Sequence, residues 1–364
     1  MPNFTKLNFT NQNKLKTKFQ RGDFLKLQNL IILADMYGCP NRCKHCWIGH
    51  MPNKKMSDNS DEIIVNYFKP HFDSITFYSW LREPDFCNDY EQRWNKDNQI
   101  SVNAKSQRFE LASFWRLVRD KNYVHFLKNV GVKKVQLTFF GMEEMTDWYI
   151  GRKGAFNELL QATEILLNNK IAPRWQVFIN ANNSTDIIKL LEKSKELKLS
   201  ERCKSFGEKF DFFIHSGSCD GENRKLYSIR INKEDIPSEL IPYYNDFSET
   251  KTESQLYELL KNDESNFSYN IENEITLNIS NNFDVYFNFT HIHPKWKIGN
   301  ILTDNSKILV QKIIDEDIPA LNLAKKIKLK DLTIQFGNPH SHKIFDCIDD
   351  YKAYLLNKII ESEN

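Results

Sequence analysis

No apolar run in the sequence approaches the length of a membrane span, and residues 1–19 are polar and lack the apolar core of a signal peptide. We therefore expect a cytoplasmic protein with no membrane partner. The sequence also lacks a large excess of charge of either sign, because basic and acidic residues are nearly balanced and the net charge is +2. Such a balance indicates no bulk nucleic-acid binding. The seven cysteines are odd in number, and three of them lie within eight positions. This spacing argues against a disulfide framework and suggests metal ligands in a reducing compartment.

The hydrophobic share of 40% and the charged share of 27% are typical of a globular protein, long enough for one large enzyme domain or a barrel with an appendage. Apolar runs alternate with amphipathic segments, which predicts βα units around a parallel sheet. The predicted strands are Leu30–Met36, Ser74–Ser79, Gln107–Ser113, Lys134–Phe140, Arg174–Asn180 and Lys209–His215. The predicted helices among them are Asp61–Phe68, Asn122–Val130, Phe156–Asn168 and Ser184–Glu196. Six strands with intervening helices indicate an open, partial α/β barrel.

The pattern changes after residue 220. Two apolar runs, Ile275–Ile279 and Phe283–Phe289, flank a polar turn and predict an antiparallel hairpin. Helices are predicted within Ser248–Asn266, Lys307–Asp315 and Tyr351–Ser362. We therefore divide the chain into a lead-in at 1–28, a barrel at 29–224 and a smaller C-terminal α+β extension at 225–364.

Cys39, Cys43 and Cys46 have the spacing C-x3-C-x2-C and follow the first predicted strand. Three thiolates bind three irons of a [4Fe–4S] cluster and leave the fourth iron open for a small chelating ligand. The amino and carboxylate groups of S-adenosylmethionine (SAM) are such a ligand, and an electron from the cluster could then break the C5′–S bond of SAM. The alternative is a zinc site, which usually needs a fourth Cys or His ligand. His45 lies between two of the cysteines, which is a poor position for the fourth ligand of a closed zinc site, whereas His50 could be that ligand.

This motif resembles that of the radical SAM superfamily, and the resemblance extends over about 190 residues. It implies a partial (β/α)6 barrel like part of a TIM barrel, with SAM lying across the C-terminal edge of the sheet. It also implies that Cys39, Cys43 and Cys46 are the cluster ligands and that SAM is the second cofactor. Members of the family often have an aromatic residue before the third cysteine, where this chain has His45.

The stretch after the second strand resembles the Gly-Gly-Glu-Pro segment that receives the SAM amino group in the family. Glu83 and Pro84 match that segment, whereas Leu81 and Arg82 replace its glycines. Backbone recognition tolerates this replacement only if the backbone dihedrals suit residues other than glycine. The alternative is an ordinary turn.

Three further residues are candidates for SAM binding. Residues 137–156 resemble the fourth-strand region of enzymes with a SPASM or twitch extension, where the residue matching Arg152 would pair with the SAM carboxylate; the alternative is a surface arginine. Ser113 could bind SAM or cap a helix. Asn183 resembles an asparagine that binds the ribose hydroxyls, although asparagine also favours any strand-to-helix turn. His215 ends the sixth strand, where catalytic groups collect in barrels, but a structural histidine is the simpler interpretation.

Residues 276–301 resemble the hairpin and Gly-Asn-Ile stretch of SPASM and twitch extensions, but they lack the clustered cysteines of those extensions. We therefore predict a single cluster and an extension that acts as a lid or substrate platform. The other cysteines are far apart in sequence and are interpreted as buried thiols; they are Cys87, Cys203, Cys219 and Cys347. Two His-x-His pairs could form a metal site but are more simply polar loop residues; they comprise His291, His293, His340 and His342.

The resemblance implies reductive cleavage of SAM and abstraction of a substrate hydrogen by the 5′-deoxyadenosyl radical. An external electron donor such as flavodoxin or ferredoxin is the expected partner. The first hypothesis for the substrate is a peptide or a peptide-derived natural product, and the second is a small metabolite such as a sugar, a nucleoside or an amino-acid derivative. A third hypothesis, from another class, is a zinc-binding interaction module that has no catalytic turnover. No catalytic side chain is identified from the sequence.

Overall fold

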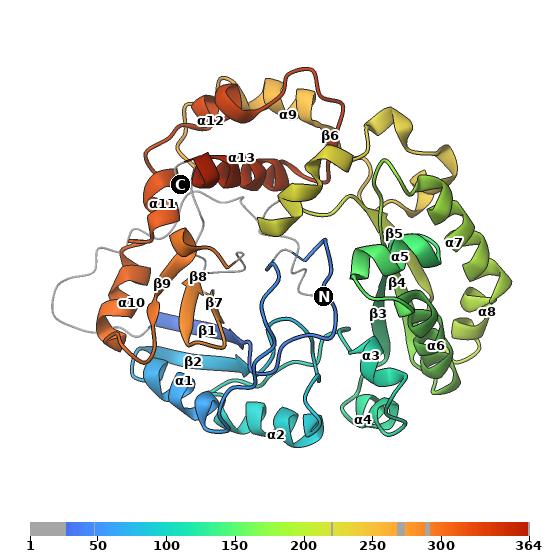
Figure 1. Cartoon of the computed structure of the whole chain (residues 1–364), viewed down its shortest axis with the longest axis horizontal. Coiled ribbons are helices and arrows are strands. Elements are labelled where there is room, and N and C mark those ends of the chain that lie inside the picture. The colour runs from blue at the N-terminus through green and yellow to red at the C-terminus, as the bar shows by residue number, and fades with distance from the viewer. Residues whose placement is uncertain (1–26, 47, 220, 268–273, 288–291, 363–364) are drawn as a thin grey trace.

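The computed structural model of the chain describes residues 27–46, 48–219, 221–267, 274–287 and 292–362. The parallel strands form an open, partial barrel with helices around it, and a smaller C-terminal part contains both helices and strands (Figure 1). Within the residues described, no helix is long and apolar enough to cross a membrane. The predicted α/β fold class is confirmed.

The barrel part alternates strands and helices, as the hydrophobic pattern predicts. Its strands are β1 (Leu27–Ala34), β2 (Phe72–Tyr78), β3 (Lys134–Phe139), β4 (Ala172–Phe178) and β5 (Asp211–His215). Its helices are α1 (Ser60–Phe68), α2 (Tyr90–Ile100), α3 (Phe114–Leu117), α4 (Tyr123–Asn129), α5 (Glu143–Ile150), α6 (Ala155–Asn168), α7 (Ser184–Glu196) and α8 (Leu199–Lys204). Every second residue of β3 is buried against the helices, which is the period expected of a strand with one covered face.

The C-terminal part begins with short 3-10 helices at Gly221–Ile229, Lys233–Asp235 and Ser238–Tyr243. The elements that follow are β6 (Lys251–Thr252), α9 (Glu253–Leu260), β7 (Glu274–Ile279), β8 (Asp284–Phe287), a 3-10 helix (Pro294–Trp296), β9 (Lys297–Asn300), α10 (Ser306–Ile314), α11 (Pro319–Ala324), α12 (Leu329–Phe336), β10 (Ile344–Phe345) and α13 (Ile348–Ser362). The predicted hairpin is confirmed, because β7 and β8 pair in antiparallel fashion.

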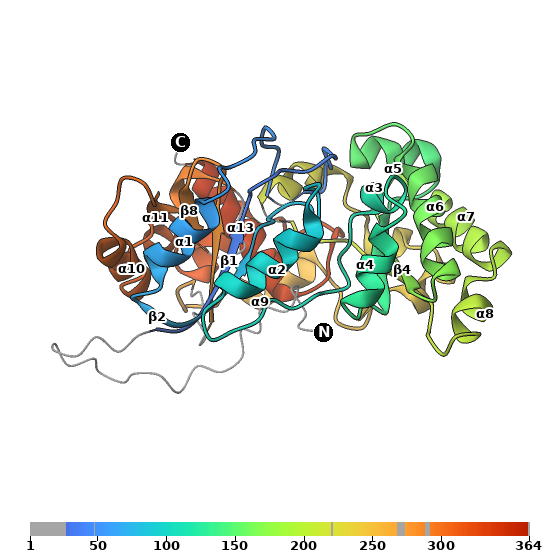
Figure 2. The same cartoon turned by 90° about the horizontal axis from the view of Figure 1, so that it is seen from below.

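The strands of the barrel lie in two sheets on opposite sides of the molecule (Figures 1 and 2). One sheet has the order β2-β1-β7-β8-β9, and the other has the order β3-β4-β5. β1 lies between β2 and β7 in the first sheet and pairs in parallel with both. The C-terminal hairpin therefore extends the barrel sheet beyond β1 and is not a separate layer.

The predicted third strand, Gln107–Ser113, is wrong: these residues form no strand in the structure described. The segment is held by its side chains instead. Arg108 forms an ion pair with Asp85, whose Oδ1 accepts a hydrogen bond from Nη1 at 2.9 Å, and only the carbonyl of Glu110 bonds to β3, through the amide of Gln136 at 2.7 Å. Within the described residues, no ladder joins β2 to β3, and the barrel has five strands before the extension in place of six.

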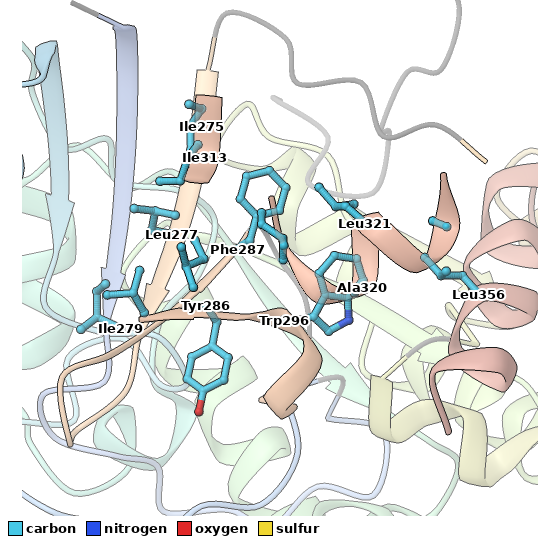
Figure 3. Close-up of a cluster of buried hydrophobic side chains, with 14 of the residues drawn as sticks. Ile275, Leu277, Ile279, Tyr286, Phe287, Trp296, Ile313, Ala320, Leu321 and Leu356 are labelled. Carbon is cyan, nitrogen blue, oxygen red and sulfur yellow. The ribbon is translucent and has the colours of Figure 1, made fainter. Parts of the chain in front are cut away.

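The two larger hydrophobic cores of the described residues correspond to the two sheets. One core covers β3, β4 and β5 with helices α4 to α8. The other contains residues of β1 and β2 together with the C-terminal strands and helices, so the barrel and the extension share it. Figure 3 shows side chains of β7 and β8 packed with Trp296 and with side chains of α10, α11 and α13. Shared burial of this kind makes the extension part of the folded barrel.

Ile32 lies in β1 at the centre of the shared core and is fully buried, so replacing it with alanine leaves a cavity. We expect Ile32→Ala to lower the free energy of unfolding by about 2–5 kcal/mol in denaturant titrations. The matched control is Ile308→Ala on α10, where the side chain is 61% exposed. A change within about 0.5 kcal/mol is expected there. Equal losses in the two variants would contradict the shared core.

Candidate functional site

The loop that carries the three cysteines begins directly after β1. Gly38 has a φ of +95°, and a Cβ atom there would collide with the Asn53 side chain, so glycine is needed at this turn. The Asn53 side chain hydrogen-bonds to both backbone groups of Cys39. Its Oδ1 accepts a hydrogen bond from the Cys39 amide at 3.0 Å, and its Nδ2 donates to the Cys39 carbonyl at 2.9 Å. The position of the first thiol is thus fixed by a side chain 14 residues further along the chain.

The second half of this loop docks on the end of α5. The amides of Arg42 and Lys44 donate to the carbonyls of Ile150 and Tyr149 at 3.0 and 2.8 Å. These carbonyls belong to the last turn of α5, where a helix leaves its carbonyls without helical partners. Gly151 ends the helix with a φ of +69°, and a Cβ atom there would lie 2.6 Å from the Arg42 carbonyl oxygen. The loop and the helix therefore fit only because residue 151 is glycine.

All three cysteines of the loop carry reduced thiols, and all three are partly buried. Burial raises the pKa of Cys39 and Cys43, and the neighbouring thiols of the trio raise it further, which shows that the three groups lie near one another. Buried thiolates of this kind need a cationic partner, and an iron–sulfur cluster supplies one. Among the described residues, no three metal-binding side chains converge closely enough to hold a single metal ion. A four-iron cluster binds each thiolate through a different iron, so the donor set fits such a cluster better than one zinc ion.

The loop after β2 is braced against the start of the cysteine loop. Arg82 forms a bidentate ion pair with Asp35, with Nε and Nη2 donating at 3.0 and 2.8 Å, and both side chains are nearly fully buried. Arg82 and Leu81 both have negative φ angles, so the backbone conformation does not require the glycines that they replace. Pro84 is buried at the end of this loop.

Glu83 lies between the first thiol and the start of α3. It accepts a hydrogen bond from the Ser113 hydroxyl at 2.6 Å, and its other carboxylate oxygen is 3.9 Å from the Cys39 sulfur. Burial raises the pKa of Glu83 to about 7, although the Ser113 hydroxyl opposes the rise. Ser113 also caps α3, because its hydroxyl accepts from the Arg116 amide at 3.2 Å.

Arg152 lies beside the cysteine loop. Its Nε donates to the Asn41 side chain at 2.9 Å, and its Nη2 is 2.7 Å from Glu158. Only 19% of the side chain is exposed, so Arg152 differs from an ordinary surface arginine. The guanidinium also lies over the ring of Phe114, with 5.4 Å to the ring centroid.

The hydrogen bonds of the Asn183 side chain all go to backbone groups and serve the fold. Its Nδ2 donates to the carbonyls of Phe140 and Phe178 at 2.7 and 2.8 Å, and its Oδ1 accepts from the Asn180 amide at 2.8 Å. The side chain is buried and ties together the ends of β3 and β4. Both of its donor hydrogens are therefore used in the fold, and its contact with ribose stays a prediction.

A pocket opens beside the cysteine loop at the carboxyl ends of β3, β4 and β5. Its aromatic wall is a stack in which Phe140 lies parallel to Tyr149 at 4.5 Å and to Phe178 at 5.4 Å. The ring of His45 packs on this wall, 4.6 Å from Phe140. Burial, with the nearby His215, lowers the pKa of His45 to about 3, so the ring is neutral and can pack like an aromatic residue.

Two buried polar atoms of this pocket have no hydrogen-bond partner among the described residues: Nδ1 of His45 and Oδ1 of Asn223. Asn223 is only 7% exposed, and a buried amide oxygen is costly to leave unpaired. Aromatic faces next to unpaired polar atoms fit a planar, hydrogen-bonding group such as adenine. The sequence gives no signal for Asn223, which lies in the 3-10 helix Gly221–Ile229 after β5.

The end of β5 carries a hydrogen-bonded network that the sequence analysis missed. Gln176 accepts from Gln136 and Thr138 at 2.7 and 3.1 Å, so its Nε2 donates to Nε2 of His215 at 2.6 Å. This leaves the His215 proton on Nδ1, which is 3.6 Å from Asp346. His215 therefore has the hydrogen-bonded environment expected of a structural histidine, on the face of the sheet turned away from the helices.

Asp346 reaches this network from the segment before α13. It accepts hydrogen bonds from the Ser216 hydroxyl at 2.8 Å, the Gly217 amide at 3.2 Å and the Tyr244 hydroxyl at 2.7 Å. Burial alone would raise the pKa of Asp346, but the His215 ring and its other partners outweigh burial and hold the pKa below its usual value. The C-terminal part thus supplies a carboxylate to the edge of the barrel.

The remaining cysteines lie on separate elements: Cys87 after β2, Cys203 in α8, Cys219 after β5 and Cys347 before α13. Of the four histidines in pairs, His291 lies outside the described residues. His293 accepts from the Lys295 amide at 3.2 Å, and His342 is 2.6 Å from Glu234 at the surface. For His293 and His342 these contacts fit the prediction of polar loop residues, and for His291 it stays a prediction.

The fit between Gly151 and Arg42 gives a matched pair of variants. Gly151 and Gly154 both have positive φ, but among the described residues no atom would lie within 4 Å of a Cβ at Gly154. Both alanine variants carry backbone strain of about 1–3 kcal/mol, and only Gly151→Ala also displaces the cysteine loop. We expect Gly151→Ala to bind much less iron after anaerobic reconstitution than Gly154→Ala. Equal iron contents would show that the docking does not position the thiols.

The sequence was compared with known proteins. Residues 34–198 match the radical SAM superfamily. No curated protein matches the sequence. Among solved structures, native anSMEcpe with bound AdoMet and Cp18Cys peptide has 14% identity and a TM-score of 0.45, covering 93% of this chain and 99% of that chain. Streptococcus suis SuiB bound to precursor peptide SuiA has 13% identity and a TM-score of 0.41, covering 89% of this chain and 76% of that chain.

At these identities and TM-scores the structural likenesses carry no functional conclusion. The match over residues 34–198 includes the cysteine loop, Glu83, Ser113, Arg152 and Asn183. Radical SAM enzymes use a [4Fe–4S] cluster and SAM, and the donor set of the cysteine loop fits that cluster. Residues 34–198 form a radical SAM domain, and the chain is a radical SAM enzyme.

Proposed function

We propose that the chain cleaves SAM reductively and uses the 5′-deoxyadenosyl radical to abstract a hydrogen from a peptide or a peptide-derived natural product. The observation that carries the proposal is the cysteine loop, whose three reduced, partly buried thiols lie near one another between β1 and α5. Cys39, Cys43 and Cys46 would hold the cluster, which supplies the electron for cleavage and an iron for the amino and carboxylate groups of SAM.

The side chains around the cysteine loop would bind the rest of SAM. Arg152 is held by Asn41 and Glu158 with its guanidinium near Cys43, which suits a carboxylate placed at the cluster. The loop with Glu83 and Pro84 would receive the amino group, and Ser113 orients Glu83. The aromatic wall beside His45 would hold the adenine, with the ribose near Asn180 and Asn183. The protein would thereby hold the reacting C5′ close to a protected substrate.

The chemistry of the inner face of the β3–β5 sheet favours a peptide as the substrate. This face is formed by the less buried residues of each strand, and its charges are paired: Arg174 with Glu110 at 3.0 Å and Lys134 with Asp211 at 2.7 Å. The side-chain amides of Gln136 in β3 and Gln176 in β4 also lie on this face. A surface whose charges are paired and that also carries amides suits backbone amides better than phosphates, which need unpaired cations. A short precursor-peptide gene beside this one would support a peptide, and genes of sugar or nucleotide metabolism would favour the metabolite.

The proposal also includes the division into 1–28, 29–224 and 225–364, with the last part as a lid or substrate platform without a cluster. A reducing, cytoplasmic compartment would keep the thiols free for iron. An external electron donor, a flavodoxin or a ferredoxin, would reduce the cluster.

Cys43→Ala should abolish 5′-deoxyadenosine formation with dithionite after anaerobic reconstitution, because it removes one of three cluster ligands. Cys203→Ala, at a fully buried position of α8, is the matched control and should keep the activity. Wild-type protein should carry about four irons per chain. Formation of 5′-deoxyadenosine by Cys43→Ala would refute the assigned ligands, and about eight irons would refute a single cluster.

Arg152→Gln should weaken SAM binding by about tenfold to a hundredfold, because a hydrogen-bonded charge is lost from the carboxylate site. Equilibrium binding of SAM to the reconstituted enzyme measures this effect. Arg202→Gln is the control, since Arg202 also pairs with a glutamate of α6, Glu164, but at the surface. Equal affinities for the two variants would remove Arg152 from the SAM site.

A further inference from the structure

The outer surface of the cysteine loop carries exposed cations directly beside the thiols. Arg42 and Lys44 are exposed, whereas the residues that alternate with them, Asn41, Cys43 and His45, are buried or partly buried. The alternation is fixed by the backbone bonds of Arg42 and Lys44 to the last turn of α5. Two positive charges are therefore held rigidly at the outer side of the loop.

An exposed aromatic ring lies next to these cations. Trp148 of α5 is 51% exposed, and Nζ of Lys44 lies 4.5 Å from the centroid of its ring. Lys153 is exposed on the short connection that follows α5. We call Arg42, Lys44, Trp148 and Lys153 the basic surface. Figures 1 and 2 show α5 beside the loop that follows β1.

Most carboxylates near the basic surface already have ion-pair or hydrogen-bond partners. Glu158 is shared by Arg119 and Arg152, and Asp147 accepts from the amides of Gly154 and Phe156 at the start of α6. Glu143 and Glu144 lie in the first turn of α5, at the opposite end of the helix from Gly151. Among the described residues, no ion pair joins Arg42, Lys44 or Lys153 to a carboxylate, so these positive charges can meet a partner of opposite charge.

We propose that the basic surface is the docking site of an acidic one-electron carrier protein, a reduced flavodoxin. The proposal rests on the proposed function, which needs one electron from outside for each cleavage of SAM. One electron leaves the flavin hydroquinone, which becomes the semiquinone and releases a proton to solvent, and the oxidised cluster takes up that electron. The acidic rim of the carrier complements the cations, and Trp148 offers a flat apolar contact for the exposed edge of the flavin.

Docking is measured on the full reconstituted chain by the fluorescence anisotropy of dye-labelled flavodoxin, at low and high salt. The variants are Trp148→Ala and the double variant Lys44→Gln/Lys153→Gln. The control is Lys204→Gln, because Lys204 is exposed on α8, at the edge of the molecule away from the loop (Figures 1 and 2). We expect each test variant to bind about tenfold more weakly than wild type, the control to bind normally, and high salt to weaken the wild-type complex.

A second readout separates docking from chemistry. Formation of 5′-deoxyadenosine with reduced flavodoxin should fall in parallel with affinity, whereas formation with dithionite, a small reductant, should be unchanged in Trp148→Ala. Wild-type affinity in both test variants, undetectable binding to wild type, or tighter binding of a ferredoxin than of flavodoxin would each overturn the proposal. A wild-type enzyme inactive with dithionite would instead overturn the proposed function, and its flavodoxin affinity would still decide the docking site.

Discussion

The docking of the cysteine loop on the last turn of α5 determines much of the site. Two loop amides satisfy two helix carbonyls that have no helical partner, and glycine at position 151 makes room for this approach. Because β2 and β3 form no ladder within the described residues, this contact provides a backbone link between the β1 side and the β3–β5 side of the barrel. It holds the thiols against the β3–β5 side, while β1 and Asn53 hold them on the other. Arg152 follows the same helix end and is therefore placed beside Cys43 by the same geometry.

The C-terminal part is built into this arrangement. β7 pairs with β1 along its length, so the strand that delivers the cysteine loop is supported by the extension on one side and by β2 on the other. Asp346 joins the end of β5 and lies 3.6 Å from Nδ1 of His215, the nitrogen that carries the proton because Gln176 donates to the other one. The extension thus touches both sheets of the barrel, which is the position that a substrate platform needs.

Local patterns were sufficient for much of the fold, and they singled out the cysteine loop whose three thiols are predicted to hold the cluster. Strand alternation located β1 to β5 to within three residues at each end, and α7 was predicted with its observed bounds. Gln107–Ser113 was wrongly predicted as a strand because its apolar residues suit one, whereas the distant Asp85 holds Arg108 in an irregular path. Asn223 and Asp346 could not be identified from the sequence, since their roles depend on packing between segments far apart in the chain. Asn183 had a recognisable position, but its buried hydrogen bonds became visible only in the structure.

The central claim is that Cys39, Cys43 and Cys46 hold a cluster with one iron open to SAM. The most direct test is the electron paramagnetic resonance spectrum of the reduced, reconstituted chain, recorded with and without SAM. The account predicts the signal of a reduced [4Fe–4S] cluster whose shape changes when SAM is added, because SAM binds the iron that lacks a cysteine. A signal that SAM leaves unchanged, or a protein that takes up one zinc ion and gives no signal, would contradict the account.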